Sequence, residues 1–410
     1  MSTDLERSLA SEFARAAGHA PGPRGDLRAR IEEGHRVRRR RFVALYAAGV
    51  VVVLSASVPL AVDALTAEPP AATDPSPEPT GRPRYRPADK SYPPIEKVWP
   101  GAVHVIPKKL PNGRAFRPEL FLDDDTVLAT TLEDGHADRL DGLWAYDLTS
   151  RTARRLVQIT PPPKTVVTAS FISAGGGRLA WWTVRKQDRK RIVDIWAAPA
   201  SGGARYKVTS FEGVPRFGGI DMQIVGDKAV WSRWGKGGLR QVPLTGGKVE
   251  TVPGSTGHTL LTWPWAGSPA ASSGQFNKVA FGTLANLQTG QVIGAKVRRG
   301  STCHVTWCLW DRTATRRDGT GERPVPGDAN TNFSRIPALD RFLALSQAGE
   351  RGRQGGQVLY DLTTGRAGDL GLRPDERGGP GSASLDYRST GLFTYERDGK
   401  QVVVNLAAIK

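Results

Sequence analysis

The chain has 410 residues, with 47 glycines, 30 prolines and a formal net charge of +17. This length allows one large domain with appendages or two ordinary domains, and the glycine and proline content favours many turns and short strands over long helices. The charge is dispersed, because residues 1–41 hold ten arginines and six acidic residues, and the remaining excess is interleaved with acids. No run beyond residue 41 combines dense basic and aromatic residues, so we predict no nucleic-acid partner.

Residues 1–41 predict two short helical pieces separated by Pro21-Gly22-Pro23. Leu5, Leu9 and Phe13 lie at i, i+4 spacing and form one apolar face of the first piece. Three interpretations of this face stay open: it binds a cytoplasmic partner, it lies on the bilayer, or the helix is marginal and has no partner.

The next segment, Phe42–Val62, has 21 residues and no charged side chain. A helix of that length spans about 31 Å, which matches a hydrocarbon core of roughly 30 Å. Arg36 and Arg38–Arg41 stand directly before it, whereas acids and prolines follow it. By the positive-inside rule, this asymmetry places the N-terminus in the cytoplasm. We therefore predict a cytoplasmic basic tail (1–41), a transmembrane helix (42–62) and a single-pass protein of the cell membrane with an extracellular C-terminal domain.

Two other interpretations of this segment stay open. Val62-Asp63-Ala64 is a weak small-residue site at which a signal peptide would be cleaved. Arg39-Arg40-Arg41-Phe42-Val43 fits the twin-arginine export pattern, which any run of arginines matches easily. The long leader and the long apolar stretch favour an uncleaved anchor.

Residues 63–95 predict a proline-rich linker, because nine prolines lie between residues 66 and 95. Such a segment is semi-extended and has no core, so it holds the outer domain away from the membrane. From residue 96 to residue 410, short apolar runs alternate with glycine, aspartate and proline turns. This pattern predicts one extracytoplasmic all-β domain over 96–410.

One sequence element, a strand end followed by a turn, recurs along this domain. Its marker positions are Asp147, Pro199, Pro243, Asn286, Asp318, Asp361 and Asn405, at steps of 52, 44, 43, 32, 43 and 44 residues. A repeat of this length built of strands and tight turns is what a β-propeller blade requires, since a four-stranded blade must bury both faces against its neighbours.

A second element, an apolar strand with a small residue, counts six instead of seven. Its copies are Val127–Ala129, Leu179–Trp181, Ala229–Trp231, Val279–Phe281, Leu343–Leu345 and Leu392–Tyr395. We favour seven blades over six and expect an irregular blade at residues 297–327. We also expect a strand near Val103–Ile106 to complete the last blade, whose chain stops at Lys410.

With these features the chain resembles the single-pass bacterial membrane proteins that end in a WD-repeat-like or TolB-like β-propeller. The resemblance rests on four features: the arginine run with Phe42–Val62, the proline linker, the Asp-Leu-Thr turns at Asp147 and Asp361, and the hairpin Thr302–Cys308. The resemblance covers most of the chain at the level of motifs, but the Ser-Pro-Asp-Gly turn of TolB-like blades is absent from the sequence. It implies a binding or scaffolding domain and supplies no shared catalytic residues.

Cys303 and Cys308 are the only cysteines, and both lie in the predicted outer domain. Two cysteines outside the reducing cytosol favour a disulfide, which in so short a loop fixes local shape more than global stability. His304 between them raises a metal interpretation, but a fourth ligand and the usual zinc spacing are missing. We predict no metal, no cofactor and no catalytic residue.

Other candidate sites have simpler interpretations. Asp123-Asp124-Asp125 lacks the alternating ligands and glycine of a calcium loop and predicts a polar turn. Gly175–Gly177 and Gly235–Gly238 predict hairpin turns, because no helix follows either run as a phosphate loop requires. Six tryptophans either pack between blades or line a carbohydrate- or peptide-binding mouth: Trp181, Trp182, Trp231, Trp234, Trp263 and Trp265.

The function that these features favour is that of a membrane-anchored sensor or scaffold whose propeller binds a protein or a cell-envelope ligand. The alternative is a propeller enzyme acting on envelope glycan or peptide, which needs carboxylates or histidines that meet near the axis. A structural envelope protein without a small ligand is a third possibility.

Overall fold

A computed structural model describes residues 92–133, 139–167, 171–188, 190–213, 220–232, 237–270, 281–326, 336–348, 354–373, 383–385 and 391–410. The chain divides into two compact units, Met1–Leu54 and Ser55–Lys410, and every described residue belongs to the second. The predicted tail, transmembrane helix and most of the linker therefore lie outside the described residues. Within the described part, no helix has the length and apolar character needed to span a membrane.

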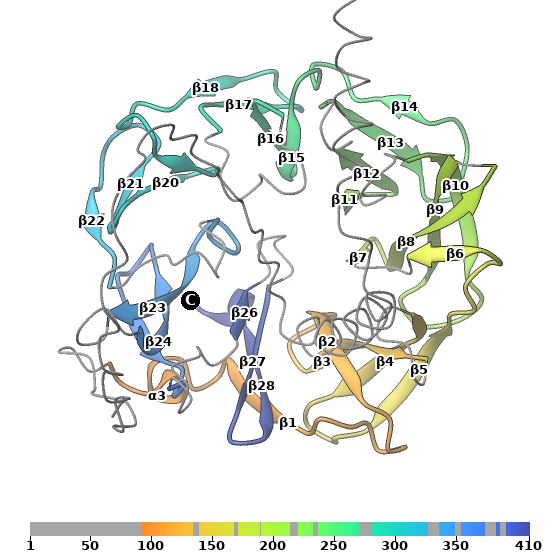
Figure 1. The fold of residues 1–410 in the computed structure, drawn as a ribbon, viewed down its shortest axis with the longest axis horizontal. Helices are drawn as coiled ribbons and strands as arrows, with labels where there is room; N and C mark the ends of the chain where they lie inside the picture. The colour runs from red at the N-terminus through yellow and green to blue at the C-terminus, as the bar shows by residue number, and fades with distance from the viewer. Residues whose placement is uncertain are drawn as a thin grey trace, which may run out of the picture. The chain divides into compact units, whose positions relative to one another are not determined.

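The described strands form seven antiparallel sheets around a common centre, which is the seven-bladed β-propeller favoured by the sequence (Figure 1). Blade 1 consists of β2 (Phe116–Phe121), β3 (Thr126–Leu132), β4 (Leu140–Asp147) and β5 (Ala153–Gln158). Blade 2 consists of β6 (Thr165–Val167), β7 (Ile172–Gly175), β8 (Arg178–Gln187), β9 (Lys190–Pro199) and β10 (Tyr206–Glu212). Blade 3 consists of β11 (Asp221–Val225), β12 (Lys228–Ser232), β13 (Leu239–Pro243) and β14 (Glu250–Thr251).

The remaining blades have shorter strands. Blade 4 consists of β15 (Thr259–Thr262), β16 (Trp265–Ser268), β17 (Thr283–Asn286) and β18 (Val292–Gly294), and blade 5 consists of β19 (Thr302–Cys303), β20 (Trp307–Trp310), β21 (Thr313–Arg316) and β22 (Arg323–Pro324). Blade 6 has three described strands, β23 (Phe342–Ala348), β24 (Gln354–Asp361) and β25 (Ala367–Asp369). Blade 7 consists of β26 (Ala383–Leu385), β27 (Leu392–Arg397), β28 (Lys400–Asn405) and β1 (Val103–Ile106). Blade 5 occupies the region in which the sequence predicts an irregular blade.

Adjacent blades meet in apolar clusters, and the described residues form seven of these clusters, one for each pair of neighbours. Leu179 and Trp181 of β8 lie in the cluster shared with blade 1, whereas Ala180 and Trp182 lie in the cluster shared with blade 3. Successive side chains of a strand point to opposite faces, so a strand that is packed on both faces must be apolar at every position. This requirement explains the continuous apolar runs of the second element.

The N-terminal strand closes the ring, as the sequence predicts. β1 pairs antiparallel with β28 as the outermost strand of blade 7, in the register Val103↔Val404. The helix α3 (Ile95–Val98) precedes β1 and packs in the cluster between blades 6 and 7. Arg397 of β27 forms an ion pair with Glu96 of α3. The segment that enters from the linker therefore fastens two neighbouring blades.

The turn element marks the same place in every blade. The third strands β4, β9, β13, β17, β24 and β28 all end on a marker residue, and β21 of blade 5 ends two residues before Asp318. Of the predicted copy Val279–Phe281, only Phe281 is described; it lies two residues before the third strand of blade 4, whose second strand is β16. The second strand of blade 5, β20, was not predicted. The missing copy in blade 5 accounts for the count of six.

Candidate binding surface

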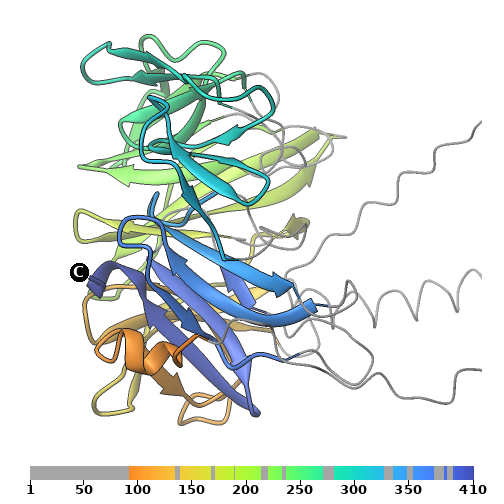
Figure 2. The same ribbon diagram turned by 90° about the vertical axis from the view of Figure 1, so that its left-hand side faces the viewer.

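One end of the propeller is taken up by tight turns. In each blade the chain passes from the innermost strand outwards, and neighbouring strands are antiparallel, so all third strands end at the same end of the propeller. We call this end the turn end. The C-terminus lies there (Figure 2). At this end Asp147 Oδ1 accepts a hydrogen bond of 2.6 Å from the Ser150 amide, and Asn286 Oδ1 accepts one of 3.0 Å from Gln288. In both turns a short side chain replaces a backbone acceptor, and the Asn286 contact, to the amide two residues on, is an Asx turn.

The carboxylates of these turns are held in the ionised form. Hydrogen bonds from Ser150 lower the pKa of Asp147, and hydrogen bonds from Thr320 lower the pKa of Asp318. Burial raises the pKa of Asp361, but hydrogen bonds from Arg341 and neighbouring threonines outweigh it and lower the pKa overall. A general acid for glycoside cleavage needs a raised pKa, so these groups suit turn stabilisation and do not suit proton donation.

Arg341 also joins the C-terminus to blade 6. Its Nη2 lies 2.7 Å from Asp361 Oδ2, and its Nη1 donates a hydrogen bond of 2.7 Å to the carbonyl of Ile409. A third hydrogen bond, of 3.2 Å, reaches the carbonyl of Lys410. Arg341 and the turn carboxylates Asp147, Asp318 and Asp361 thus help to hold the fold together.

At the opposite end, blades 1 and 2 carry buried or half-buried acids that are already paired. Asp194 of β9 accepts a hydrogen bond of 2.8 Å from Arg185 Nε and one of 2.6 Å from Ser210 Oγ. Asp141 of β4 accepts a hydrogen bond of 2.6 Å from Thr131 Oγ1 and forms an ion pair with Arg114. Both carboxylates are therefore satisfied by their own blade or its entry segment.

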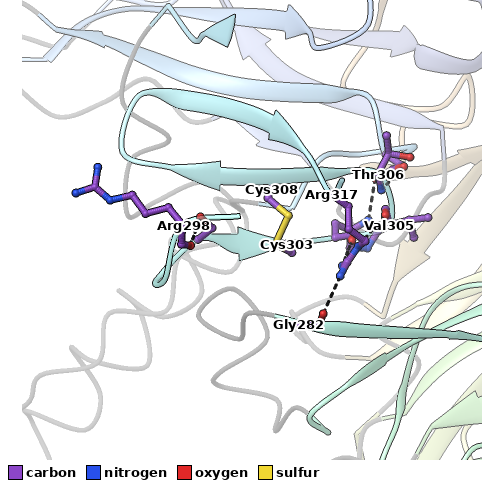
Figure 3. Close-up of a disulfide and its surroundings, with 10 residues drawn as sticks. Gly282, Arg298, Cys303, Val305, Thr306, Cys308 and Arg317 are labelled. Atoms are coloured by element: carbon purple, nitrogen blue, oxygen red, sulfur yellow. Dashed lines mark hydrogen bonds and ion pairs between the residues drawn. A yellow bond between two sulfur atoms is a disulfide. The ribbon is translucent and has the colours of Figure 1, made fainter. Parts of the chain in front are cut away.

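The hairpin of β19 and β20 in blade 5 carries both cysteines. Cys303 and Cys308 lie directly opposite each other in the register, and a disulfide joins them (Figure 3). Both residues are buried. The His304 amide donates a hydrogen bond of 2.8 Å to the Trp307 carbonyl, which closes the turn at the tip of this hairpin. The disulfide therefore fixes the register of the two strands on either side of the tip.

Arg317 holds the tip of this hairpin against blade 4. Its Nε donates a hydrogen bond of 3.1 Å to Val305 O, its Nη1 donates one of 3.3 Å to Gly282 O, and its Nη2 donates one to His304 O (Figure 3). Burial lowers the pKa of Arg317 to about 10, and the nearby charge of Asp340 opposes this shift. Three backbone carbonyls from two blades thus share one buried cation.

Asp340 holds the same hairpin tip from the side of blade 6. Its Oδ2 accepts a hydrogen bond of 2.9 Å from the Thr306 amide, and its Oδ1 lies 3.3 Å from His304 Nδ1. His304 is buried, and its ring faces this carboxylate. Since both cysteine sulfurs form the disulfide, His304 has no thiolate beside it to complete a metal site. Within the described ranges, no group of three or more histidine, cysteine, aspartate or glutamate residues is placed to hold a metal ion.

Two of the other predicted turns, at Asp123–Asp125 and at Gly175–Gly177, are turns in the structure. Asp123 Oδ1 accepts a hydrogen bond of 3.0 Å from the Asp125 amide, directly before β3, so the acidic run forms a polar turn. Gly176 and Gly177 have φ values of 53° and 68° in the hairpin between β7 and β8. Only part of the second glycine run is described, and its Gly237 also has a positive φ, of 65°.

The tryptophans divide between the core and the surface in a way that the sequence does not show. Trp181, Trp182 and Trp231 are buried between blades, which is the core-packing interpretation. Trp263 and Trp265 are half-buried, and Trp234 lies outside the described residues. Among the described tryptophans, Trp310 is the most exposed, at 37%, and it was not among the six candidates.

Trp310 lies at the end of blade 5 opposite the turn end, where β20 ends and where the chain enters from blade 4. The guanidinium carbon of Arg298 lies 4.7 Å from the centre of the indole ring. Gly300, with φ of 89°, lies so close that a Cβ atom would come within 2.6 Å of the same ring. The backbone amide and hydroxyl of Ser301 both donate hydrogen bonds to the Arg298 carbonyl, at 3.1 and 2.7 Å. We call Arg298, Gly300, Ser301 and Trp310 the blade-5 rim.

Comparison with known proteins adds likeness of fold only. No protein-family model matches the chain, and no curated protein matches it by sequence. Among solved structures, an acylaminoacyl peptidase in complex with a chloromethyl ketone is 13% identical, with a TM-score of 0.39, over 65% of this chain and 44% of that one. The match thus spans less than half the length of that peptidase.

Two further solved structures match over most of their own length. AztD from Citrobacter koseri is 13% identical, with a TM-score of 0.39, over 75% of this chain and 92% of that one. The GH93 α-L-arabinofuranosidase of Fusarium graminearum is 10% identical, with a TM-score of 0.30, over 77% of this chain and 96% of that one. At such identities, the activities of these proteins do not transfer to this chain.

Proposed function

We propose that this protein is a membrane-anchored, extracytoplasmic β-propeller that binds a ligand or protein of the cell envelope. In this proposal the helix 42–62 spans the cell membrane, the tail 1–41 lies in the cytoplasm, and the linker 63–95 carries the propeller outside. We place the binding surface at the end of the propeller opposite the turn end, since Asp147, Asp318, Asp361 and Arg341 at the turn end already stabilise turns and the C-terminus.

The observation that carries the proposal is the buried disulfide between Cys303 and Cys308, which uses both cysteines of the chain. Structural disulfides persist in oxidising compartments and are rare in the cytosol. The arginine run and the 21-residue apolar segment before the propeller support the same location. Among the described carboxylates with shifted pKa values, Asp147, Asp318 and Asp361, none has the raised pKa that a general acid for glycan cleavage requires.

The topology is tested with the full chain carrying a different epitope at each terminus, expressed in a bacterium. The chain should stay in carbonate-washed membranes. Protease added to intact spheroplasts should remove the C-terminal epitope and spare the N-terminal one. A C-terminal epitope that is cut only after lysis would refute the extracytoplasmic location. A soluble fragment in the medium that begins after residue 62 would refute the permanent anchor.

A further inference from the structure

We propose that the blade-5 rim binds an anionic glycan, a sugar polymer that carries carboxylate or phosphate groups. A sugar ring packs on the exposed part of the Trp310 indole, and an anionic group of the same polymer pairs with Arg298. This inference rests on the proposed function, because it names the class of ligand that the binding surface takes.

The first argument is unneutralised charge. At the same end of the propeller, Arg114 before blade 1 and Arg185 of blade 2 are paired with Asp141 and Asp194. Arg298 and Arg299 are exposed, and no carboxylate in the described part of the chain pairs with either of them. An exposed guanidinium without a carboxylate partner offers a planar fork that matches carboxylate and phosphate geometry. The rim is therefore complementary to an anion.

The second argument is the shape of the aromatic surface. The Trp310 indole has an exposed apolar part beside the Arg298 guanidinium and the Gly300 backbone, and its neighbours Arg298, Gly300, Ser301 and Asp311 carry no large apolar side chain. Peptide partners are bound chiefly through side chains that fill well-packed pockets. A sugar ring needs only a flat apolar surface for its C–H groups and polar groups at the edge. These features favour a glycan over an acidic peptide.

The third argument is that the rim is held rigid before any ligand binds. The disulfide pairs Cys303 with Cys308, and the next pair outward, Thr302 with Leu309, brings Ser301 beside Trp310. Ser301 then fixes the turn that carries Arg298. Figure 3 shows Arg298 extending outward at the end of the hairpin away from Thr306. Preorganised groups lose less conformational entropy on binding, so a small rim can bind with useful affinity.

The test measures binding of the purified full chain at physiological salt to three polymers. Polygalacturonate is the anionic glycan, its methyl ester is the same glycan without charge, and poly-L-glutamate is an acidic peptide. We expect polygalacturonate to bind at least about tenfold more tightly than either of the others, which corresponds to about 1.4 kcal/mol. Trp310→Ala should weaken this binding by about tenfold, and Arg298→Gln by about fivefold or more, as expected for one stacking and one charge-assisted contact.

Arg155→Gln is the matched control. Arg155, on β5 of blade 1, has its guanidinium carbon 6.0 Å from the centre of the Trp144 ring, and its replacement removes the same single positive charge as Arg298→Gln. This control should bind within about twofold of the wild type, since an exposed arginine far from the rim adds little to affinity.

Equal binding of poly-L-glutamate would assign an acidic peptide and overturn the proposal. Binding that both rim variants leave unchanged would reflect net charge alone and would also overturn it. If Trp310→Ala fails to fold by circular dichroism, Arg298→Gln decides the outcome. Failure here leaves the topology result standing, so the two proposals fail separately.

Discussion

Replacing Arg317 by methionine should destabilise the propeller at the junction of blades 4 and 5. Methionine keeps most of the length of the side chain but removes every hydrogen-bond donor. The cluster between these blades has few fully buried apolar residues in the described structure, namely Leu261, Phe281, Leu284 and Ile336. The polar contacts of Arg317 should therefore matter more here than at a larger interface.

The expected loss follows from two opposing contributions. Arg317 donates to three backbone carbonyls, and hydrogen bonds to a charged group contribute about 2 kcal/mol each, or about 6 kcal/mol together. The reduction of its pKa from 12.5 to about 10 corresponds to a cost of about 3 kcal/mol for burying the charge. The difference predicts that Arg317→Met loses about 3 kcal/mol of unfolding free energy.

Urea unfolding of the full chain, followed by tryptophan fluorescence, measures this loss. Arg316→Met is the control, because Arg316 is exposed and makes a cation–π contact of 5.9 Å with Trp307. The control should lose less than about 1 kcal/mol. If Arg317→Met loses no more than Arg316→Met, the three carbonyl contacts contribute little and the reasoning is refuted.

Three further changes test other parts of the fold. Ile106→Ala should lose about 2–4 kcal/mol, because Ile106 is buried on the closing strand, whereas Val105→Ala on its exposed face should be nearly neutral. Replacing Cys303 and Cys308 by serine should lose about 2 kcal/mol, since a loop of five residues constrains the unfolded chain only modestly. For Asp361 the folded pKa lies below the unfolded value of 3.8, so its stabilising contribution is present above pH 3.8 and is lost as the pH falls below it. The stability difference between wild type and Asp361→Asn should therefore be constant near neutral pH and shrink in acid.

Each of these changes has a clear contrary result in urea or thermal unfolding. Equal losses for the two β1 variants would mean that β1 does not close the ring as described. No loss on serine substitution would mean that the disulfide does not constrain the unfolded chain as described. A stability difference for Asp361→Asn that stays constant through pH 3 would remove the ionised carboxylate as its cause.

The architecture was predictable because each blade repeats the same short-range turn contacts. Residues such as Asp147 and Asp361 end a strand and cap the turn after it with their own side chains, so the marker needs no distant partner. The closing role of Val103–Ile106 was also predictable, since a propeller whose last blade lacks an outer strand needs one from elsewhere. Seven markers therefore gave the number of blades before any tertiary contact was known.

The second element failed where its physical basis is weakest. A run such as Val279–Phe281 has the composition of any buried segment, so composition alone does not assign it to the second strand of a blade. In blade 5 the second strand carries Cys308 among tryptophans and has no alanine at the expected place. The apolar requirement is the same in both cases, and only the pairing register distinguishes them.

The blade-5 rim and Arg317 were not predictable from sequence for a different reason. Arg298 meets Trp310 across a hairpin, and Arg317 reaches Gly282 on another blade. Neither pair has a fixed spacing or a motif, because each contact depends on the register of strands and the packing of blades. The nearest sequence signal for the rim was the cysteine pair, which locates the hairpin that positions Trp310.

The most direct test of the binding account is hydrogen-exchange footprinting of the full chain with and without polygalacturonate. The account predicts slower exchange in residues 298–312, around Trp310. It predicts no change in the turns that follow Asp147 and Asp361 at the turn end. Protection of those turns, or of no segment at all, would contradict the claim that the propeller binds its ligand at the end carrying the blade-5 rim.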